Sequence, residues 1–82
     1  MDLVQLTEFI VKSLVVNEEN VSVKEFESDE ENTVLIQVLV DSEDMGRIIG
    51  KGGKIANAVR ILIQASSYIK DNKKIKINID SF

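Results

Sequence analysis

The sequence predicts an α+β fold in which three helices pack on one face of a three-stranded sheet, in the order α-β-β-α-α-β. Two long stretches carry apolar residues at helical spacing, and three others are rich in β-branched residues. Short polar segments separate these elements, and no linker or internal repeat interrupts them. A chain of 82 residues therefore forms one small domain over residues 1–82, and this packing is the simplest that buries its apolar faces.

The first half of the chain contains one predicted helix and two predicted strands. The helix spans residues 3–16, and its apolar positions recur at helical spacing: Leu3, Leu6, Phe9 or Ile10, and Leu14. A strand follows over residues 21–27, where Phe26 is out of phase with the preceding valines, which indicates a bulge or a strand end. The next strand, over residues 33–40, is apolar on both faces, which is typical of a central strand or one covered on both sides.

The second half begins with a short helix that runs to about Ile49. Asp41 or Ser42 caps it, and the acidic residues at its start suit the positive end of the helix dipole. A longer helix is predicted over residues 54–69. Its expected buried positions are Ile55, Val59, Leu62, Ser66 and Ile69, backed by Ala58 and Ala65. The last strand, over residues 73–79, points Ile75, Ile77 and Ile79 inward.

Composition excludes several classes of function. The chain has no cysteine and no histidine, so it lacks the usual ligands of a zinc site and the usual acid–base catalyst near neutral pH. The remaining serine, lysine, tyrosine and carboxylate side chains form no nucleophile–base pattern. We therefore expect a protein that is not an enzyme, with no catalytic residue, metal site, cofactor or small-molecule substrate.

The N-terminal segment does not read as a secretory signal. Polar and charged residues interrupt its apolar positions, and no run approaches the length of a transmembrane helix. The sequence thus predicts a cytoplasmic protein with no membrane partner.

Charge is distributed unevenly along the chain, although its formal net value is -4. Residues 1–44 hold twelve acidic and two basic side chains, whereas residues 45–82 hold eight basic and two acidic ones. Such asymmetry indicates a polar molecule with one basic face. Because salt screens distant charges over about 8 Å, a local basic patch can hold phosphates on an acidic protein.

The most informative segment is the glycine-rich loop Gly50-Lys51-Gly52-Gly53 between the two last predicted helices. Glycine has no Cβ, so the backbone can approach a ligand closely and adopt positive φ. The N–H groups of the loop and of the following helix start form a phosphate site, beside which Lys51 and Lys54 add charge. The same four residues would also serve as a plain helix–helix connection. Their spacing does not fit a Walker A loop or a dinucleotide fingerprint.

The segment from Met45 to Ile55 resembles the core of a KH domain. That motif is a hydrophobic pair, here Ile48-Ile49, followed by Gly-x-x-Gly and a helix. The element order is similar to the type II, bacterial form of the fold. Residues 46–51 and 53–60 are also similar to the pattern of the KhpA-type family of small stand-alone bacterial KH proteins. The resemblance covers essentially the whole chain.

This resemblance implies a protein that binds single-stranded RNA, because the Gly-x-x-Gly loop of KH domains clamps the backbone of about four nucleotides. Bases would lie across an aliphatic groove lined by Ile48, Ile49 and Ile55, and backbone groups of the central strand would read base edges. The implied RNA-binding residues are Gly46, Arg47, Ile48, Ile49, Gly50, Lys51, Gly52, Gly53, Lys54 and Ile55.

Two positions depart from the wider KH pattern. Many KH domains place an isoleucine where this chain has Ala56, with Ile55 just before it, an arrangement that the KhpA-type pattern shares. Gly52 occupies the second variable position of the loop and leaves Lys51 as its single charge. This predicts modest affinity.

The resemblance further implies a role as an RNA chaperone or post-transcriptional regulator linked to cell-shape control. It also implies a homodimer and association with a larger KH-containing protein, and pairing would add avidity to weak RNA contacts. The alternative is a protein-interaction module whose scaffold mainly mediates homo- or heterodimerisation. The surplus apolar residues that would supply an interface are Val15, Val16, Leu35 and Leu39.

The remaining charged and aromatic residues carry weaker expectations. Residues 29–31 are acidic and read as a solvated turn rather than a metal site. Lys74 and Lys76 share the outer face of the last strand, where they either extend the RNA path or, as we favour, keep an edge strand soluble. The aromatic residues are too few for stacking platforms (Tyr68 and Phe82) or are expected in the core (Phe9 and Phe26).

Overall fold

The computed structural model describes residues 2–82 and confirms the predicted order α-β-β-α-α-β. The helices are α1 (Leu3–Leu14), α2 (Met45–Ile49) and α3 (Lys54–Lys70). The strands are β1 (Ser22–Glu27), β2 (Thr33–Val40) and β3 (Lys74–Ser81). Single 3-10 turns lie at Glu18–Asn20, Ser42–Asp44 and Lys51–Gly53. The predicted bounds of β2 agree with these, and the predicted ends of α1, β1, α3 and β3 agree or differ by one or two residues.

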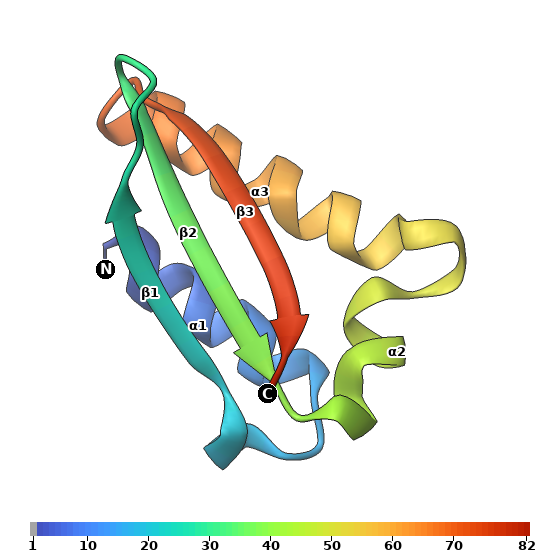
Figure 1. Cartoon of the computed structure of the whole chain (residues 1–82). Coiled ribbons are helices and arrows are strands. Elements are labelled where there is room, and N and C mark those ends of the chain that lie inside the picture. The colour runs from blue at the N-terminus through green and yellow to red at the C-terminus, as the bar shows by residue number, and fades with distance from the viewer. Residues whose placement is uncertain (1) are drawn as a thin grey trace.

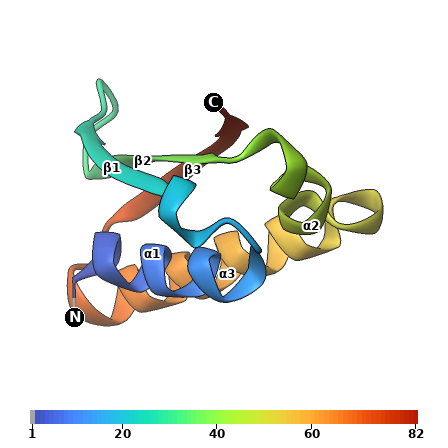
Figure 2. The same cartoon turned by 90° about the horizontal axis from the view of Figure 1, so that it is seen from below.

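The sheet has the order β1-β2-β3, so β2 is central and the other two strands form its edges. β1 pairs antiparallel with β2, whereas β2 pairs parallel with β3. A parallel pair needs a crossover connection, which α2 and α3 provide. Figures 1 and 2 show α1 and α3 on one face of the sheet, as predicted, and α2 toward one end of it. The glycine-rich loop projects from that end (Figure 1).

The core lies between the inner face of β2 and the helices. Ile36, Val38 and Val40 are fully buried on β2, and each helix contributes a fully buried residue to the same cluster: Val11, Ile48 and Ile63. Burying a side chain of this size is worth about 1.5–3 kcal/mol. α2 is therefore fixed to the core through Ile48, although it is only five residues long.

α1 starts at a capping box and ends earlier than predicted. The Asp2 carboxylate accepts the Gln5 N–H at 2.7 Å, and the Gln5 side chain accepts the Asp2 N–H at 3.0 Å. The helix stops at Leu14, and Val15 is extended. The next two N–H groups donate to the Asp44 carboxylate instead of continuing the helix.

The expectation that Phe9 and Phe26 belong to the core is wrong. Phe9 lies on the outer side of α1 and is mostly exposed, because its neighbour Ile10 takes the place against the core. Phe26 pairs with Leu35 in regular register, so β1 has no bulge there. Its side chain lies on the sheet face that no helix covers, which explains why it is out of phase with Val23.

The predicted buried face of α3 is correct at Val59 and wrong at most of its other positions, where the structure buries the next residue along the chain or none. The buried residues are Ala56, Val59, Ile63 and Ser67, whereas Ile55, Leu62 and Ile69 are exposed, as are Ala58 and Ala65. The helix carries apolar residues around most of its circumference, so periodicity alone did not identify the face. Ser67 is acceptable in the buried stripe because its hydroxyl donates to the Lys73 carbonyl at 2.7 Å.

Among the helices of residues 2–82, none is long and apolar enough to cross a membrane.

Candidate nucleic-acid interface

The loop between α2 and α3 has a backbone that glycine adopts readily. Gly50, Gly52 and Gly53 have φ of 71°, 66° and 78°. Gly50 combines this φ with a ψ of -179°, a region that is essentially restricted to glycine. Gly52 and Gly53 lie in the left-handed region, with ψ of 19° and 12°. The sequence therefore needs glycine at the first position of the loop for conformational reasons.

Gly50 is also required by close packing. A Cβ on Gly50 would lie 2.8 Å from Cγ1 of Ile55, inside van der Waals contact. No atom lies within 4 Å of a Cβ placed on Gly52 or Gly53, so those two positions are open. Ile55 thus packs over the start of the loop and holds its two ends together.

Alanine at Gly50 should destabilise the fold more than alanine elsewhere in this segment. We expect Gly50→Ala to lower the free energy of unfolding by roughly 2 kcal/mol, from strain and the clash with Ile55. Gly52→Ala should cost about 1 kcal/mol, for the left-handed backbone alone. Gly46→Ala, in α2 with open space around it, should be neutral or stabilising by up to about 1 kcal/mol. Urea denaturation measures all three, and equal values for the three variants would contradict this account.

Two backbone donors of the loop are unused. The N–H of Gly50 donates to Gly46, that of Gly53 donates to Gly50, and that of Lys54 donates to Lys51. Within residues 2–82, the N–H groups of Lys51 and Gly52 donate to no backbone carbonyl. They stand directly before α3, whose N-cap residue Gly53 supplies no side-chain hydrogen bond to the helix. Free N–H groups at the positive end of a 17-residue helix favour an anion.

Basic side chains surround these donors. Lys51 and Lys54 are exposed and make no ion pair or hydrogen bond within the described part of the chain. Arg47 precedes the loop, and its Nε lies 3.8 Å from Oδ1 of Asp44. Arg60 lies further along α3 and donates to the Asn57 side chain at 3.1 Å. Basic side chains therefore lie on both sides of the loop along the chain.

Nine of the ten candidate site residues can be reached from solvent, and one cannot. The exposed residues are Gly46, Arg47, Lys51, Gly52, Lys54 and Ile55, and the partly exposed ones are Ile49, Gly50 and Gly53. Ile48 is fully buried and anchors α2 in the core. Ile49 and Ile55 therefore remain as the apolar residues of this set that a ligand can reach.

The expectation that the central strand reads base edges must be corrected. β2 is paired on both sides, with β1 and with β3, so its backbone groups are occupied. The sheet has two unpaired edges, β1 and β3, and β3 is the one on the side of α2 and the loop (Figure 1). The Gln64 side chain covers the start of that edge, since it accepts the Ile75 N–H at 2.8 Å and donates to the Lys73 carbonyl at 3.0 Å. Beyond Ile75, the edge of β3 is available.

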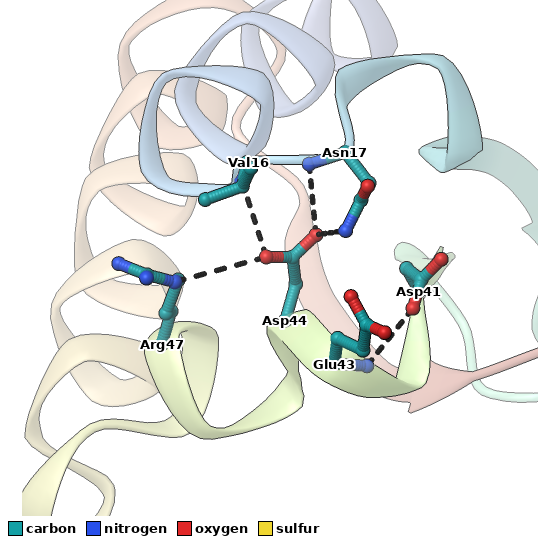
Figure 3. Close-up of polar contacts among 6 residues, drawn as sticks. All are labelled: Val16, Asn17, Asp41, Glu43, Asp44 and Arg47. Atoms are coloured by element: carbon teal, nitrogen blue, oxygen red, sulfur yellow. Dashed lines mark hydrogen bonds and ion pairs between the residues drawn. The ribbon is translucent and has the colours of Figure 1, made fainter.

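Asp44 is a buried polar residue that the sequence pattern did not single out beyond a helix cap. Its carboxylate is 1% exposed and accepts the Val16 N–H at 3.1 Å, the Asn17 N–H at 3.0 Å and the Asn17 side-chain amide at 3.1 Å (Figure 3). Of the two predicted caps, Asp41 and Ser42, the structure uses Asp41, which accepts the Glu43 N–H at 2.9 Å and caps the 3-10 turn Ser42–Asp44 before α2. Asp44 thus joins the start of α2 to the segment that follows α1.

These contacts determine the ionisation of Asp44. Burial acts to raise its pKa, but the N–H groups of Val16 and Asn17, the Asn17 amide and the charge of Arg47 outweigh burial and hold the pKa below its ordinary value of 3.8. The ionised Asp44 carboxylate therefore stabilises the folded state. This contribution to the free energy of unfolding is complete above the ordinary pKa and is lost as pH falls through the lowered pKa of the folded state.

Replacing Asp44 should therefore destabilise the protein in a pH-dependent way. We expect Asp44→Asn to lower Tm by roughly 10 °C at pH 7, because the amide offers one acceptor to three donors and turns its own NH2 toward N–H groups. The Tm difference from wild type should stay constant from about pH 7 to 5 and shrink below about pH 4. Thermal melts followed by circular dichroism test this, and a difference that grows on acidification would contradict it.

The acidic hairpin between β1 and β2 lies at the far end of the sheet from the loop (Figure 1). Glu30 accepts a hydrogen bond from the Lys76 ammonium of β3 and forms an ion pair with it. The hydrogen bond and the positive charge of Lys76 lower the pKa of Glu30. Residues 2–82 contain no group of three or more carboxylates placed to hold a metal ion. Lys76 is thus engaged with the hairpin rather than directed to the glycine-rich loop.

Comparison with known proteins gives a consistent family. The KhpA/KhpB KH domain matches residues 4–79. The RNA-binding protein KhpA of Clostridium perfringens is 43% identical over 75 residues, covering 92% of this chain and 96% of that one. KhpA of Listeria monocytogenes is 44% identical over 70 residues, which cover 85% of this chain and 88% of that protein. KhpA of Borreliella burgdorferi is 38% identical over 76 residues, which cover 93% of this chain and 89% of that protein.

Solved structures share the fold at low sequence identity. Era of Aquifex aeolicus bound to GDP and aluminium fluoride superposes with a TM-score of 0.69 at 16% identity, covering 98% of this chain and 30% of Era. Era in complex with a segment of 16S ribosomal RNA gives a TM-score of 0.68 at 17% identity, covering 96% and 29%. The chain therefore spans about a third of the length of these proteins, and the likeness concerns the fold of that part.

Proposed function

Because this chain belongs to the KhpA/KhpB KH-domain family, we propose that it binds single-stranded RNA through the loop Gly50–Gly53. The observation that carries the proposal is the pair of free N–H groups at Lys51 and Gly52, at the start of α3 and among exposed basic side chains. Relatives that cover most of the chain bear the name RNA-binding protein. The function is binding, with no chemical step.

In this proposal the loop takes one phosphate and the groove beside it takes the bases. The N–H groups of Lys51 and Gly52 donate to phosphate oxygens, while Lys51 and Lys54 supply charge. Bases rest on Ile49 and Ile55, which are the accessible apolar residues next to the loop. The unpaired edge of β3 beyond Gln64 presents N–H and C=O groups for base edges, in place of the occupied central strand. Single strands suit this site because their bases are free to leave the stack.

Fluorescence anisotropy with labelled single-stranded RNA pools at two salt concentrations tests this function. Binding should weaken as salt rises, with a slope of about -0.7 in log–log form for each phosphate that the protein neutralises. A duplex of the same length and label is the matched ligand control and should bind more weakly, because its bases are paired. Equal affinity for duplex and single strand, or no binding at low salt, would overturn the proposal.

We also propose the cellular role that the family resemblance implies, namely an RNA chaperone or post-transcriptional regulator linked to cell shape. A small domain that clamps a few nucleotides without aromatic platforms is suited to many transcripts rather than one. Deletion of the coding sequence should alter transcript abundance and cell length together. Complementation with a folded variant that does not bind RNA should restore neither, and restoration of cell length by such a variant would separate shape control from RNA binding.

A second candidate function, protein interaction through a homodimer, is favoured by the outer face of α3. This apolar face comprises Ile61, Leu62, Ala65, Tyr68 and Ile69, and all five are exposed. Ile61 is 68% exposed and Ile69 is 85% exposed. A face of this kind on a small protein is typical of an interaction site. It offers more exposed apolar residues than the set expected from sequence, in which Val16 is exposed, Val15 packs against the core, and Leu35 and Leu39 are only partly exposed.

The outer face of α3 also has the symmetry that a two-fold dimer needs. Its large residues lie three and four positions before and after Ala65, so the pattern reads alike in both directions. Two antiparallel copies crossing at Ala65 would place Ile61 against Ile69 of the second copy, and Leu62 against Tyr68. An isologous interface requires such self-complementarity. The small side chain at the centre lets the two helices approach closely.

A dimer of this kind leaves the loop free, because the loop lies at the N-terminal end of α3. Two loops on one particle would raise the avidity for a longer RNA without any new contact. A larger KH-containing protein with a similar helix would compete for the same face, as the family resemblance implies. Light scattering over a range of concentrations tests the dimer, and a mass of 9.2 kDa at all of them would rule it out.

A further inference from the structure

Asp44 makes contacts that its place in the chain does not require. It occupies the N-cap position of α2, yet its side chain makes no cap hydrogen bond to that helix. The carboxylate instead accepts three hydrogen bonds from Val16 and Asn17, which lie 28 and 27 residues earlier in the chain. A buried carboxylate is costly unless it is fully paired. This arrangement therefore serves the connection between two segments rather than α2 alone.

α2 needs such an anchor because it has little stability of its own. It contains five residues, far fewer than an isolated helix requires in water. Ile48 fixes one side of α2 in the core, and Asp44 fixes its start to the segment after α1. With both in place, the position of the loop that follows α2 is determined at two points.

Arg47 connects this anchor to the proposed RNA site. Its Nε faces Asp44 Oδ1 at 3.8 Å, while the side chain is 61% exposed (Figure 3). At 3.8 Å this contact is an ion pair without a hydrogen bond, and it leaves the donors of both terminal nitrogens of Arg47 available. Arg47 lies three residues before Gly50 in the chain, and 61% of its side chain is exposed, so the free donors are open to a ligand that extends from the loop along α2. A guanidinium restrained in this way loses less entropy when it binds phosphate.

We propose that Asp44 is a positioning residue for RNA binding, which holds α2 against the segment after α1 and orients Arg47 toward a second phosphate next to the loop. The inference rests on the proposed function and deepens it. In this proposal Arg47 contacts the phosphates of the RNA backbone together with Lys51 and Lys54. The RNA affinity then depends on the orientation of the Arg47 side chain as well as on its charge.

A double-mutant cycle in RNA affinity tests this role. Asp44→Asn and Arg47→Gln, each measured well below its Tm, should each weaken binding by roughly 3- to 10-fold, and the double variant should be little weaker than the worse single one. Asp44→Asn combined with Lys51→Ala is the matched control, and those two effects should multiply. Multiplying effects for Asp44 and Arg47, or wild-type affinity in folded Asp44→Asn, would overturn the proposal.

Two further measurements keep the test independent of the stability of Asp44→Asn. Arg47→Lys retains the charge but not the Nε contact, so it should bind RNA more weakly than wild type and more tightly than Arg47→Gln. Wild-type affinity for Arg47→Lys would overturn the proposal. In the free protein, the heteronuclear NOE of the Arg47 Nε–H should fall in Asp44→Asn, and an unchanged NOE would also count against it. No RNA binding by the wild type would overturn the proposed function and this inference together, whereas wild-type binding that Asp44→Asn leaves unchanged overturns this inference alone.

Discussion

The double substitution Lys51→Asp, Gly52→Asp is expected to weaken single-stranded RNA binding by at least roughly 100-fold while the protein stays folded. It removes the lysine of the loop and places two carboxylates beside the N–H groups proposed to hold phosphate, so repulsion replaces attraction. Folding should survive, since both residues are exposed, a Cβ at Gly52 meets no atom within 4 Å, and aspartate tolerates the left-handed backbone. Anisotropy at low salt measures the change in affinity, and circular dichroism checks the fold.

The control for this variant is a second pair with the same change of charge at the other end of α3. Asn72→Asp, Lys73→Asp also lowers the net charge by three, in the turn that follows Lys70. A 17-residue helix separates the two sites by about 25 Å, which exceeds the screening length at physiological salt. The control should bind RNA within about threefold of wild type. Equal losses in the two variants would mean that net charge, not the loop, determines binding.

Single charged substitutions on the outer face of α3 are expected to dissociate the proposed dimer. Ile61→Lys and Ile69→Asp each bury a charge against an isoleucine of the second copy, which should raise the dimer dissociation constant by at least roughly 100-fold. Light scattering should then give 9.2 kDa, against twice that mass for wild type. Both side chains are exposed in the single chain, so the stability of the monomer should not change.

The two substitutions together should restore the dimer. In the antiparallel arrangement about Ala65, the introduced lysine of one copy faces the introduced aspartate of the other, at both ends of the interface. A mixture of the two single variants should likewise form a heterodimer. If the double variant stays monomeric while wild type is a dimer, the register about Ala65 is wrong even though α3 forms the interface. The RNA affinity of one loop for a short oligonucleotide should be the same in all these variants.

Much of this fold was predictable because its elements have strong local patterns. β2 is a run of aliphatic and β-branched residues between polar turns, and its predicted and observed bounds coincide at Thr33–Val40. β3 alternates cleanly, so its inward face was also predicted correctly. The loop was identifiable because closely spaced glycines between two helix patterns are rare unless the backbone needs them, and Gly50 does.

The errors occur where several faces of an element are apolar. α3 has two apolar stripes. The stripe with the longer side chains was predicted to face the core. The structure buries the stripe with Ala56 and Ser67 and exposes Ile61 and Ile69. Periodicity reports that a helix has apolar faces, but the partner of each face depends on tertiary packing. The exposed stripe is the basis of the dimer proposal.

Asp44 could not be assigned its role from sequence because its partners are distant along the chain. Its position in an acidic cluster before a helix indicated a cap, and the cluster does contain one, at Asp41. One signal was present: Asp44 lies four residues before the buried Ile48, so helical spacing puts both on the same face. An acidic residue on a buried face needs partners, but the helix predicted over residues 3–16 gave no indication of the break at Val15 after which those partners lie.

The most direct test of the central claim is to follow backbone amide resonances while single-stranded RNA is added to the folded protein. The account predicts that the largest shifts occur at Lys51 and Gly52, whose N–H groups are free in the unbound protein, with smaller shifts at Ile55 and along β3 beyond Ile75. It also predicts that inorganic phosphate shifts the same two amides weakly. Shifts confined to the outer face of α3, or spread evenly over all basic residues, would contradict a phosphate clamp at the loop.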